Sequence, residues 1–473
     1  MKAQRFFFSN SALTLVLAAG TIGAPAVPAA GQSGAIAPPA TVNTLVSFTG
    51  TNGSDPFTEN LVQGKDGNIY GTTLSGGASG SGTIFKVTPS GTLTTLHSFN
   101  GTDGQSPYAG LVLGVDGNFY GTTYQGGLNG DGTVFKITPA GTFTNLYNFA
   151  NTDGGFPAGA LVQGTDKNFY GTTSYSQPTV YGTIFKITSA GALTTLHFFT
   201  DTDGYDPLAG LVQGTDGEFY GTTATGGASD FGVVFKINKA GTLTSLYNFN
   251  NTEGWEPEGQ LIQASNGSFY GTTLRGGAMG DGEVFKITAS GTLTVLHSFD
   301  ITDGYEPNDG LVQATDNNFY GTTTGGGSPG GLGTIFQMTP SGTLTSLYTF
   351  TGLSGDGSIP FGGLMQHTSG AFYGVTSSGG TGHLGAVFDL GIGLAPFVKL
   401  LPASGKVGSK ITILGTNLTG ITSVTFNGTA ATFTAGSTTF LTATVPTGAT
   451  TGTVEVVTSG GTLKSNVKFK VIP

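Results

Sequence analysis

Pairs of carboxylates beside an aromatic ring recur at 50-residue intervals in the middle of the chain. Carboxylate oxygens are ligands that Ca²⁺ prefers, and aromatic faces stack on sugars or on cationic groups. One interpretation of these phrases is therefore a ligand patch. Its candidate ligand-binding residues are Tyr205, Asp206, Trp255, Glu256, Glu258, Tyr305, Glu306 and Asp309, and the weaker candidates for holding Ca²⁺ are Asp203, Glu253 and Asp303.

The same phrases also have a structural interpretation. Each places an acidic residue before glycine and a second one before proline, as in Asp203-Gly204 and Asp206-Pro207. In such a loop the carboxylate bonds its own backbone, glycine adopts a positive φ and proline stiffens the exit. Recurrence along the chain favours this role, because structural roles repeat and ligand sites usually do not. The ligand spacing of an EF-hand is absent, and no other cofactor is predicted.

The histidines offer little acid–base chemistry. His97, His197 and His297 share a repeat position with tyrosines of the other units, which predicts structural packing on the rim of the fold. His367 falls in a hairpin turn, and His383, in a glycine-rich loop, is the weak catalytic candidate. The sequence contains no nucleophile elbow, zinc-binding helix motif or phosphate-binding loop. These observations favour a protein that is not an enzyme and leave an enzyme as an alternative.

The elements that would position these residues come from a tandem repeat. The tyrosines of one phrase are Tyr70, Tyr120, Tyr170, Tyr220, Tyr270, Tyr320 and the slightly displaced Tyr373. Each unit holds four strand-like runs, which in the second unit are residues 110–113, 118–123, 133–138 and 142–149. Asp116-Gly117 predicts a two-residue hairpin turn between the first two runs. Four antiparallel strands in a unit of this length predict one blade of a β-propeller.

The strand count predicts how this propeller begins and ends. First strands begin at Leu61, Leu111, Leu161, Leu211, Leu261, Leu311 and Leu364. The seventh unit stops after its third strand, residues 386–390, whereas residues 44–48 match a fourth strand that precedes every complete unit. We therefore expect the N-terminal strand to close the last blade, which leaves no open sheet edge. The predicted fold class is all-β: a seven-bladed β-propeller with four-stranded blades, followed by an Ig-like β-sandwich.

The N-terminus predicts an export signal. Lys2 and Arg5 precede an apolar run, and cleavage is expected after Ala26 or Ala29. The run is shorter than a bilayer span, so no transmembrane anchor is expected. The predicted organisation is a signal peptide at 1–29, a linker at 30–41, the propeller at 42–393 and the Ig-like domain at 394–473. We expect a secreted, periplasmic or cell-surface protein.

The composition bounds the partners of the chain. Only 9% of the residues are charged, the net charge is −10 and the pI is about 4.8. An acidic chain without basic runs is poorly suited to nucleic acids or to anionic lipids, so no nucleic-acid partner is expected. Cysteine is absent, and an exported protein without disulfides depends on packing and on sheet hydrogen bonds.

Both parts of the chain resemble known families. From Pro396 the repeat gives way to short alternating strands with Gly and Asn-Gly turns, which predict a small β-sandwich. This stretch resembles the IPT/TIG family of immunoglobulin-like domains, which implies a spacer or binding module without catalytic residues. The phrases Asp-Gly-Asn-Phe-Tyr-Gly-Thr-Thr and Phe-Lys-Ile-Thr-Pro, over residues 42–392, resemble the bacterial choice-of-anchor "GloVer" tandem repeat, a family defined by sequence rather than by an activity. A looser similarity to streptogramin-lyase-like propellers is also present.

Three functions follow as hypotheses. The first is a secreted or surface-displayed binding protein, expected to be a monomer, that recognises an extracellular glycan, peptide or protein with the loop face of the propeller. The second is a propeller enzyme resembling the streptogramin lyases, a metal-dependent lyase or hydrolase, with His383 and carboxylates of the loop face as its reactive groups. The third is a purely structural protein of the cell envelope.

Overall fold

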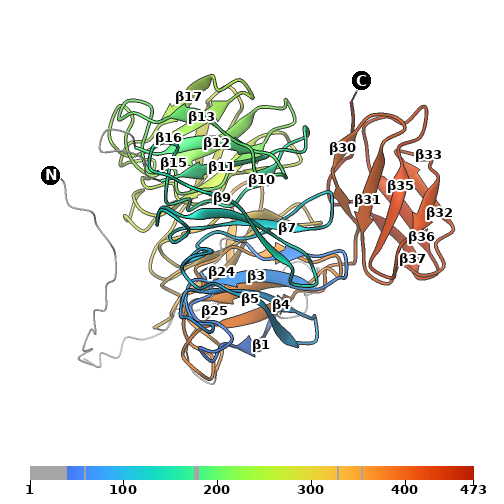
Figure 1. The fold of residues 1–473 in the computed structure, drawn as a ribbon, viewed down its shortest axis with the longest axis horizontal. Coiled ribbons are helices and arrows are strands. Elements are labelled where there is room, and N and C mark those ends of the chain that lie inside the picture. Colours follow the sequence, from blue (N-terminus) through green and yellow to red (C-terminus); the bar gives the residue numbers. More distant parts are fainter. Residues whose placement is uncertain (1–39, 58–59, 175–180, 328–329, 353–354, 473) are drawn as a thin grey trace, which may run out of the picture. The chain divides into compact units, whose positions relative to one another are not determined.

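The structure is a computed structural model that describes residues 40–472 except 58–59, 175–180, 328–329 and 353–354 (Figure 1). The predicted signal peptide and most of the predicted linker lie outside the described residues. Every regular element of the described chain is a β-strand. Within this part of the protein, no helix that could cross a bilayer is found.

Seven four-stranded antiparallel sheets make up the first part of the described chain, as predicted for propeller blades. In the first six sheets the strands follow the order of the chain, and the fourth strand forms the more exposed edge. From the first sheet to the sixth, the strands are β2 (Val62–Gln63), β3 (Ile69–Thr73), β4 (Thr83–Val87), β5 (Leu93–Ser98); β6 (Val112–Leu113), β7 (Phe119–Thr123), β8 (Thr133–Ile137), β9 (Phe143–Asn148); β10 (Val162–Gln163), β11 (Phe169–Thr173), β12 (Thr183–Ile187), β13 (Leu193–Phe198); β14 (Val212–Gln213), β15 (Phe219–Thr223), β16 (Val233–Ile237), β17 (Leu243–Asn248); β18 (Ile262–Gln263), β19 (Phe269–Thr273), β20 (Glu283–Ile287), β21 (Leu293–Ser298); β22 (Val312–Gln313), β23 (Phe319–Thr323), β24 (Thr334–Met338) and β25 (Leu344–Thr349).

The seventh sheet combines the two ends of the repeat region. Its strands are β26 (Met365–Gln366), β27 (Phe372–Thr376), β28 (Ala386–Gly391) and, from the N-terminal side, β1 (Thr41–Ser47). The pairing is antiparallel, with Thr44 opposite Phe388, so the predicted addition of the N-terminal strand to this sheet is confirmed. Phe48, directly after β1, is fully buried in a cluster with Phe85 of the first sheet and Val387 of the seventh.

Aromatic rings pack each sheet against the next one. The second-strand tyrosine stacks on a phenylalanine of the following sheet, as in Tyr70 on Phe119 at 4.0 Å between ring centroids. The third-strand phenylalanine, such as Phe135, lies in a cluster shared with the preceding sheet, so it packs between two blades. The glycine after the tyrosine makes room for a ring of its own sheet. A Cβ on Gly71 would lie 2.7 Å from the Phe85 ring.

The turn between the first and second strands differs from the prediction. Gly64 N–H donates to Asn68 O at 2.8 Å, and Gly67 N–H donates to Gly64 O, so the turn is three residues long rather than two. The Asp66 carboxylate accepts the Tyr70 hydroxyl at 2.8 Å. The Asp-Gly-Asn-x-Tyr phrase therefore anchors a buried tyrosine to the turn before it.

The last part of the chain forms the predicted β-sandwich. One sheet contains β29 (Lys399–Leu401), β31 (Lys410–Leu414), β35 (Phe440–Thr444) and β34 (Phe433–Ala435); the other contains β33 (Thr429–Ala430), β32 (Ser423–Phe426), β36 (Val454–Thr458) and β37 (Gly461–Lys464); β30 (Ser404–Gly405) pairs with β38 (Lys470–Val471). Buried Ile413 and Val456 belong to its own core cluster. The Thr439 hydroxyl donates to Lys65 O at 2.6 Å, so the sandwich contacts a hairpin turn of the propeller.

Candidate functional site

The loops that enter the first strands share an unusual backbone conformation. In each of the seven, the residue before proline has a positive φ although it is not glycine. Hydrogen bonds hold this conformation, as in Leu274 N–H to Glu256 O at 2.9 Å and Glu306 N–H to Asp281 O at 3.0 Å. The seven residues are Asp55, Ser106, Phe156, Asp206, Glu256, Glu306 and Ile359.

Ile359 is the member of this set that fits its backbone least well. Its φ is 56°, where a β-branched side chain is strained, and 38% of its surface is exposed. We expect Ile359→Asn to stabilise the protein by about 1 kcal/mol in urea unfolding, because Asn tolerates this region. Ile359→Val keeps the strain and should bring no gain. A loss of stability in the Asn variant would contradict this account.

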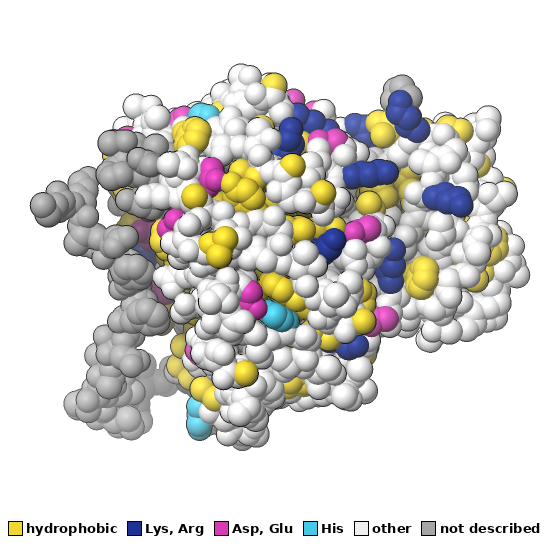
Figure 2. Space-filling model, in the orientation of Figure 1, with side chains coloured by type: hydrophobic (Ala, Val, Ile, Leu, Met, Phe, Trp, Pro, Cys, Tyr) yellow, Lys and Arg dark blue, Asp and Glu magenta, His cyan; other side chains and the backbone are white. Residues whose placement is uncertain are grey.

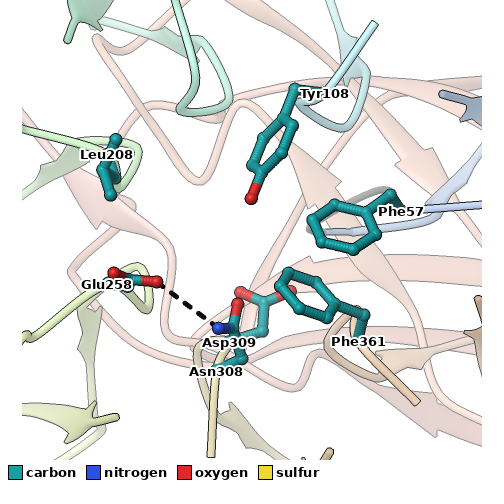
Figure 3. A pocket seen from close by; sticks show the side chains of 7 residues that line it. All are labelled: Phe57, Tyr108, Leu208, Glu258, Asn308, Asp309 and Phe361. Carbon is teal, nitrogen blue, oxygen red and sulfur yellow. Dashed lines mark hydrogen bonds between the residues drawn. The ribbon is translucent and has the colours of Figure 1, made fainter. Parts of the chain in front are cut away.

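Six of the seven residues that follow the prolines, together with Asp309, meet around a small cavity. It is lined by Phe57, Tyr108, Leu208, Glu258, Asn308, Asp309 and Phe361, and Figure 3 shows their side chains pointing from several loops toward a common centre. We call this the axial cavity. Its volume of about 20 Å³ has room for one water molecule but not for a sugar ring.

Aromatic rings form one side of the axial cavity. Phe57 stacks on Phe361 with 3.4 Å between ring centroids, and Tyr108 lies 4.9 Å from Phe57. None of these three residues was predicted from the sequence as part of a site. The signal that could have found them is the position after each loop proline, which varies among Phe, Tyr, Ala, Leu, Glu and Asn while the flanking residues repeat.

Carboxyl groups form the other side of the axial cavity. Burial, with a smaller contribution from the nearby Glu256 carboxylate, raises the pKa of Glu258 to about 8. Burial also raises the pKa of Asp309 to about 7, although its oxygens accept the N–H groups of Gly310 and Gly363. Asn308 Nδ2 donates to Glu258 Oε2 at 3.4 Å. Carboxyl groups shifted in this way in a cleft are typical of functional sites.

A single guanidinium lies among the neighbouring carboxylates. Arg275 Nε is 3.7 Å from Glu256 Oε2, and Arg275 Nη2 is 3.4 Å from Glu306 Oε1. The guanidinium also lies 5.8 Å from the centroid of the Trp255 ring. Near Glu258, burial raises the pKa of Asp206 to about 6. The predicted carboxylates Asp206, Glu256, Glu258, Glu306 and Asp309 are therefore brought to one region of the loop face.

The predicted aromatic residues lie elsewhere on that face. Tyr205, Trp255 and Tyr305 each pair with the loop that follows the second strand of their own sheet, as in Trp255 N–H to Arg275 O at 2.8 Å. A Cβ on Gly325 would lie 2.1 Å from the Tyr305 ring, so this ring packs flat on a glycine. All three side chains are half-buried and do not line the axial cavity.

The three weak metal candidates do not come together. Asp203 Oδ2 is 2.9 Å from His197 Nε2, Asp303 Oδ2 is 2.8 Å from His297 Nε2, and Glu253 accepts the Tyr247 hydroxyl at 2.7 Å. Each carboxylate thus binds the fourth strand that precedes its loop. Among the described residues, no group of three or more His, Asp or Glu could hold a metal ion. His383 is exposed in the loop between β27 and β28, with a φ of 56°.

Charge is distributed unevenly over the molecule. We define the loop face as the loops joining second to third strands and those joining one sheet to the next. Arg275 is the only Lys or Arg among its described residues. Its carboxylates are Asp55, Asp103, Asp131, Asp153, Asp201, Asp203, Asp206, Asp230, Glu253, Glu256, Glu258, Asp281, Asp300, Asp303, Glu306, Asp309 and Asp356. Lysines lie instead in strands, in other turns and in the sandwich, where Figure 2 shows several of them.

Solved structures show a similar fold at low sequence identity. A copper-bound fungal alcohol oxidase is 14% identical with a TM-score of 0.51, and the match covers 89% of this chain and 98% of that one. A proposed 6-phosphogluconolactonase from Bacteroides uniformis is 17% identical with a TM-score of 0.43, covering 64% and 88%. An auxiliary nutrient binding protein from Bacteroides thetaiotaomicron is 11% identical with a TM-score of 0.38, covering 74% and 76%. At these identities the likeness to the oxidase shows the fold alone.

Comparison with protein families identifies the family of each part of the chain. No curated protein matches it. The profile of the IPT/TIG domain matches residues 397–471, which contain the sandwich. The profile of the Gloeobacter/Verrucomicrobia repeat matches residues 31–216 and 181–388, which contain the seven sheets except the end of β28. The chain therefore belongs to the Gloeobacter/Verrucomicrobia repeat family and carries an IPT/TIG domain at its C-terminal end.

Proposed function

We propose that this protein is an exported, non-enzymatic binding protein whose loop face captures a positively charged peptide or protein segment. The observation that carries the proposal is the convergence of Asp206, Glu256, Glu258, Glu306 and Asp309 on one region where Arg275 is the only described cation. Complementary charge steers a partner to a surface and fixes its register there.

The size of the axial cavity supports a peptide over a small ligand. With room for one water molecule, it cannot enclose a sugar or a substrate of similar size. A lysine or arginine side chain lying across the mouth of the cavity could instead place its charged end near Glu258, with its methylene stem along Phe57 and Phe361.

The raised pKa values give the proposal a specific signature. At neutral pH Glu258 is mostly protonated and Asp309 is partly protonated, because burial disfavours their charged forms. A bound cation stabilises the charged forms, so binding must release protons. The released protons make the measured heat of binding depend on the ionisation enthalpy of the buffer.

The test is titration calorimetry of the full chain with decalysine at low salt, in phosphate and in Tris. We expect binding that releases protons and weakens as salt rises. Glu258→Gln should weaken binding about tenfold, since it removes one charge–charge contact. The matched control, Glu218→Gln in the turn before β15, should bind like the wild type.

Two outcomes would overturn the proposal. One is a wild type that does not bind decalysine, or a Glu258→Gln variant that binds as well as the control. The other is stronger binding of maltoheptaose, a neutral oligosaccharide, that is lost in Trp255→Ala. That result would assign the loop face to glycan recognition instead.

A further inference from the structure

The fifth sheet departs from the others at the start of its third strand. In the first, second, third and sixth sheets this position is threonine, and its hydroxyl bonds the last threonine of the second strand. The oxygen–oxygen distances are 2.8 Å for Thr73 and Thr83 and 2.7 Å for Thr173 and Thr183. In the fifth sheet the position is Glu283, which stands opposite Thr273 in the strand register. A carboxylate has thus replaced one partner of a buried hydroxyl pair.

This substitution leaves two buried oxygens without partners. Glu283 is 1% exposed, and its Oε1 accepts the Ser298 hydroxyl at 2.8 Å. Its Oε2 has no hydrogen-bond partner, nor does the Oγ1 of Thr273, which is fully buried. Unsatisfied buried polar atoms are rare and costly, and a carboxylate among them is the most costly kind. Something that the protein chain does not supply is expected to satisfy them.

Glu253 is the residue expected to supply further oxygens at this place. In the sixth sheet, the threonine at this position, Thr334, donates to the backbone carbonyl of Asp303 at 3.0 Å. The repeat makes the Glu253 carbonyl its counterpart in the fifth sheet. Burial raises the pKa of Glu283, and the charge of the nearby Glu253 carboxylate adds to this shift. No cationic side chain forms an ion pair with Glu283 in the described part of the chain.

Glycine provides space for the carboxylate. A Cβ on Gly277 would lie 2.4 Å from Glu283 Oε1, so a larger residue in this loop would displace the carboxyl group. Gly277 has a φ of 79°, which its backbone adopts without strain. The glutamate is therefore accommodated in its buried position and is not forced out to solvent.

We propose that the fifth sheet holds a hard metal cation between Glu283 Oε2 and Thr273 Oγ1, with oxygens of Glu253 completing its shell. Ca²⁺ is the ion with the matching chemistry, because it takes carboxylate, carbonyl and hydroxyl oxygens in flexible geometries. The site lies where β19 and β20 of the fifth sheet meet the loop that enters this sheet. It shares no residue with the axial cavity, so it stands independently of the proposed peptide binding.

The experiment is calorimetric titration of the chelator-stripped full chain with CaCl₂, together with its melting temperature in EDTA and in 1 mM Ca²⁺. We expect one equivalent to bind and the melting temperature to rise by several degrees. Glu283→Thr restores the hydroxyl pair of the other sheets. This variant should melt in EDTA at or above the wild-type temperature and should lose the response to Ca²⁺.

One control separates this site from the carboxyl groups of the axial cavity. Glu258→Gln should bind Ca²⁺ like the wild type. A wild type that does not respond to Ca²⁺ would overturn the proposal, and it would indicate that Glu283 is protonated and donates to Thr273. A Glu283→Thr variant that still binds one equivalent would also overturn it, because the ion would then lie elsewhere.

Discussion

Deleting residues 41–48 is expected to lower the melting temperature by roughly 10 °C or more, because it removes a whole strand and a buried ring. β1 pairs with β28 from Thr41 to Ser47, and its loss would expose the edge of β28. Phe48 is fully buried between the seventh and first sheets. Phe48→Ala alone should cost about 3–5 kcal/mol.

Thermal unfolding followed by circular dichroism measures this effect. A synthetic peptide of residues 40–49, added in excess to the truncated protein, should restore part of the lost stability by re-pairing with β28. Leu128→Ala, at a site that is 82% exposed, is the control and should melt with the wild type. An unchanged melting temperature after the deletion would mean that the two ends of the repeat region do not depend on each other.

The sequence predicted the architecture well because the repeat shows the same pattern seven times. Strand boundaries follow from alternating apolar residues and from Gly and Asp punctuation, which are local signals. The sequence shows one irregularity that it does not explain. In the fourth strands, apolar residues recur at every third position instead of every second. The structure explains it by a β-bulge, since His97 pairs with Ile84 while Thr95 pairs with Phe85, which leaves Leu96 between them.

The candidate site was predicted in part. Asp206, Glu256, Glu258, Glu306 and Asp309 do gather on one face, because equivalent positions of a propeller lie at equal distances from its axis. The axial position of the residue after each proline could not be predicted, since it depends on the positive φ of the residue before that proline. Tyr205, Trp255 and Tyr305 were predicted to bind a ligand because aromatic rings can stack on one. Their backbones instead hydrogen-bond to neighbouring loops, and their side chains do not line the axial cavity.

The role proposed for Glu283 could not be predicted from the features that the repeats share. The substitution of glutamate for threonine is plain in the sequence, at a position that also accepts valine in the fourth sheet and alanine in the seventh. Only the burial of its carboxylate, and the unpaired hydroxyl opposite, give the difference a chemical meaning. In a repeat protein, the departures from the pattern therefore carry more functional information than the pattern itself.

The second large effect that we expect is a loss of stability in acid caused by His367. Its side chain is 3% exposed in the turn between β26 and β27. The Nε2–H group donates to Gly67 O at 3.1 Å, and Nδ1 accepts the Ser369 hydroxyl at 2.8 Å, so the neutral ring is fully bonded. Burial, reinforced by the charge of Lys399, lowers the pKa of His367 to about 4.

The sign of the effect follows from proton binding. In the unfolded chain this histidine gains a proton near pH 6.5, whereas in the folded protein it stays neutral until about pH 4. Between these values the unfolded state binds more protons, so the free energy of unfolding falls by about 3 kcal/mol as the pH drops from 6.5 to 4. The raised pKa values of Glu258 and Asp309 act in the opposite direction, so the effect must be isolated by comparison with a variant.

His367→Gln provides that comparison, since its amide can donate to Gly67 O and accept from Ser369 but cannot gain a proton in this range. Urea unfolding at pH 7.0, 5.5 and 4.0 should show a wild type that loses about 3 kcal/mol relative to the variant between the first and last values. His383→Gln, which changes an exposed histidine, should follow the wild type at every pH. If the free energy of unfolding changed with pH equally in the wild type and in His367→Gln, the folded protein would take up this proton as readily as the unfolded chain. The neutral hydrogen-bonding pattern assigned to His367 would then be wrong.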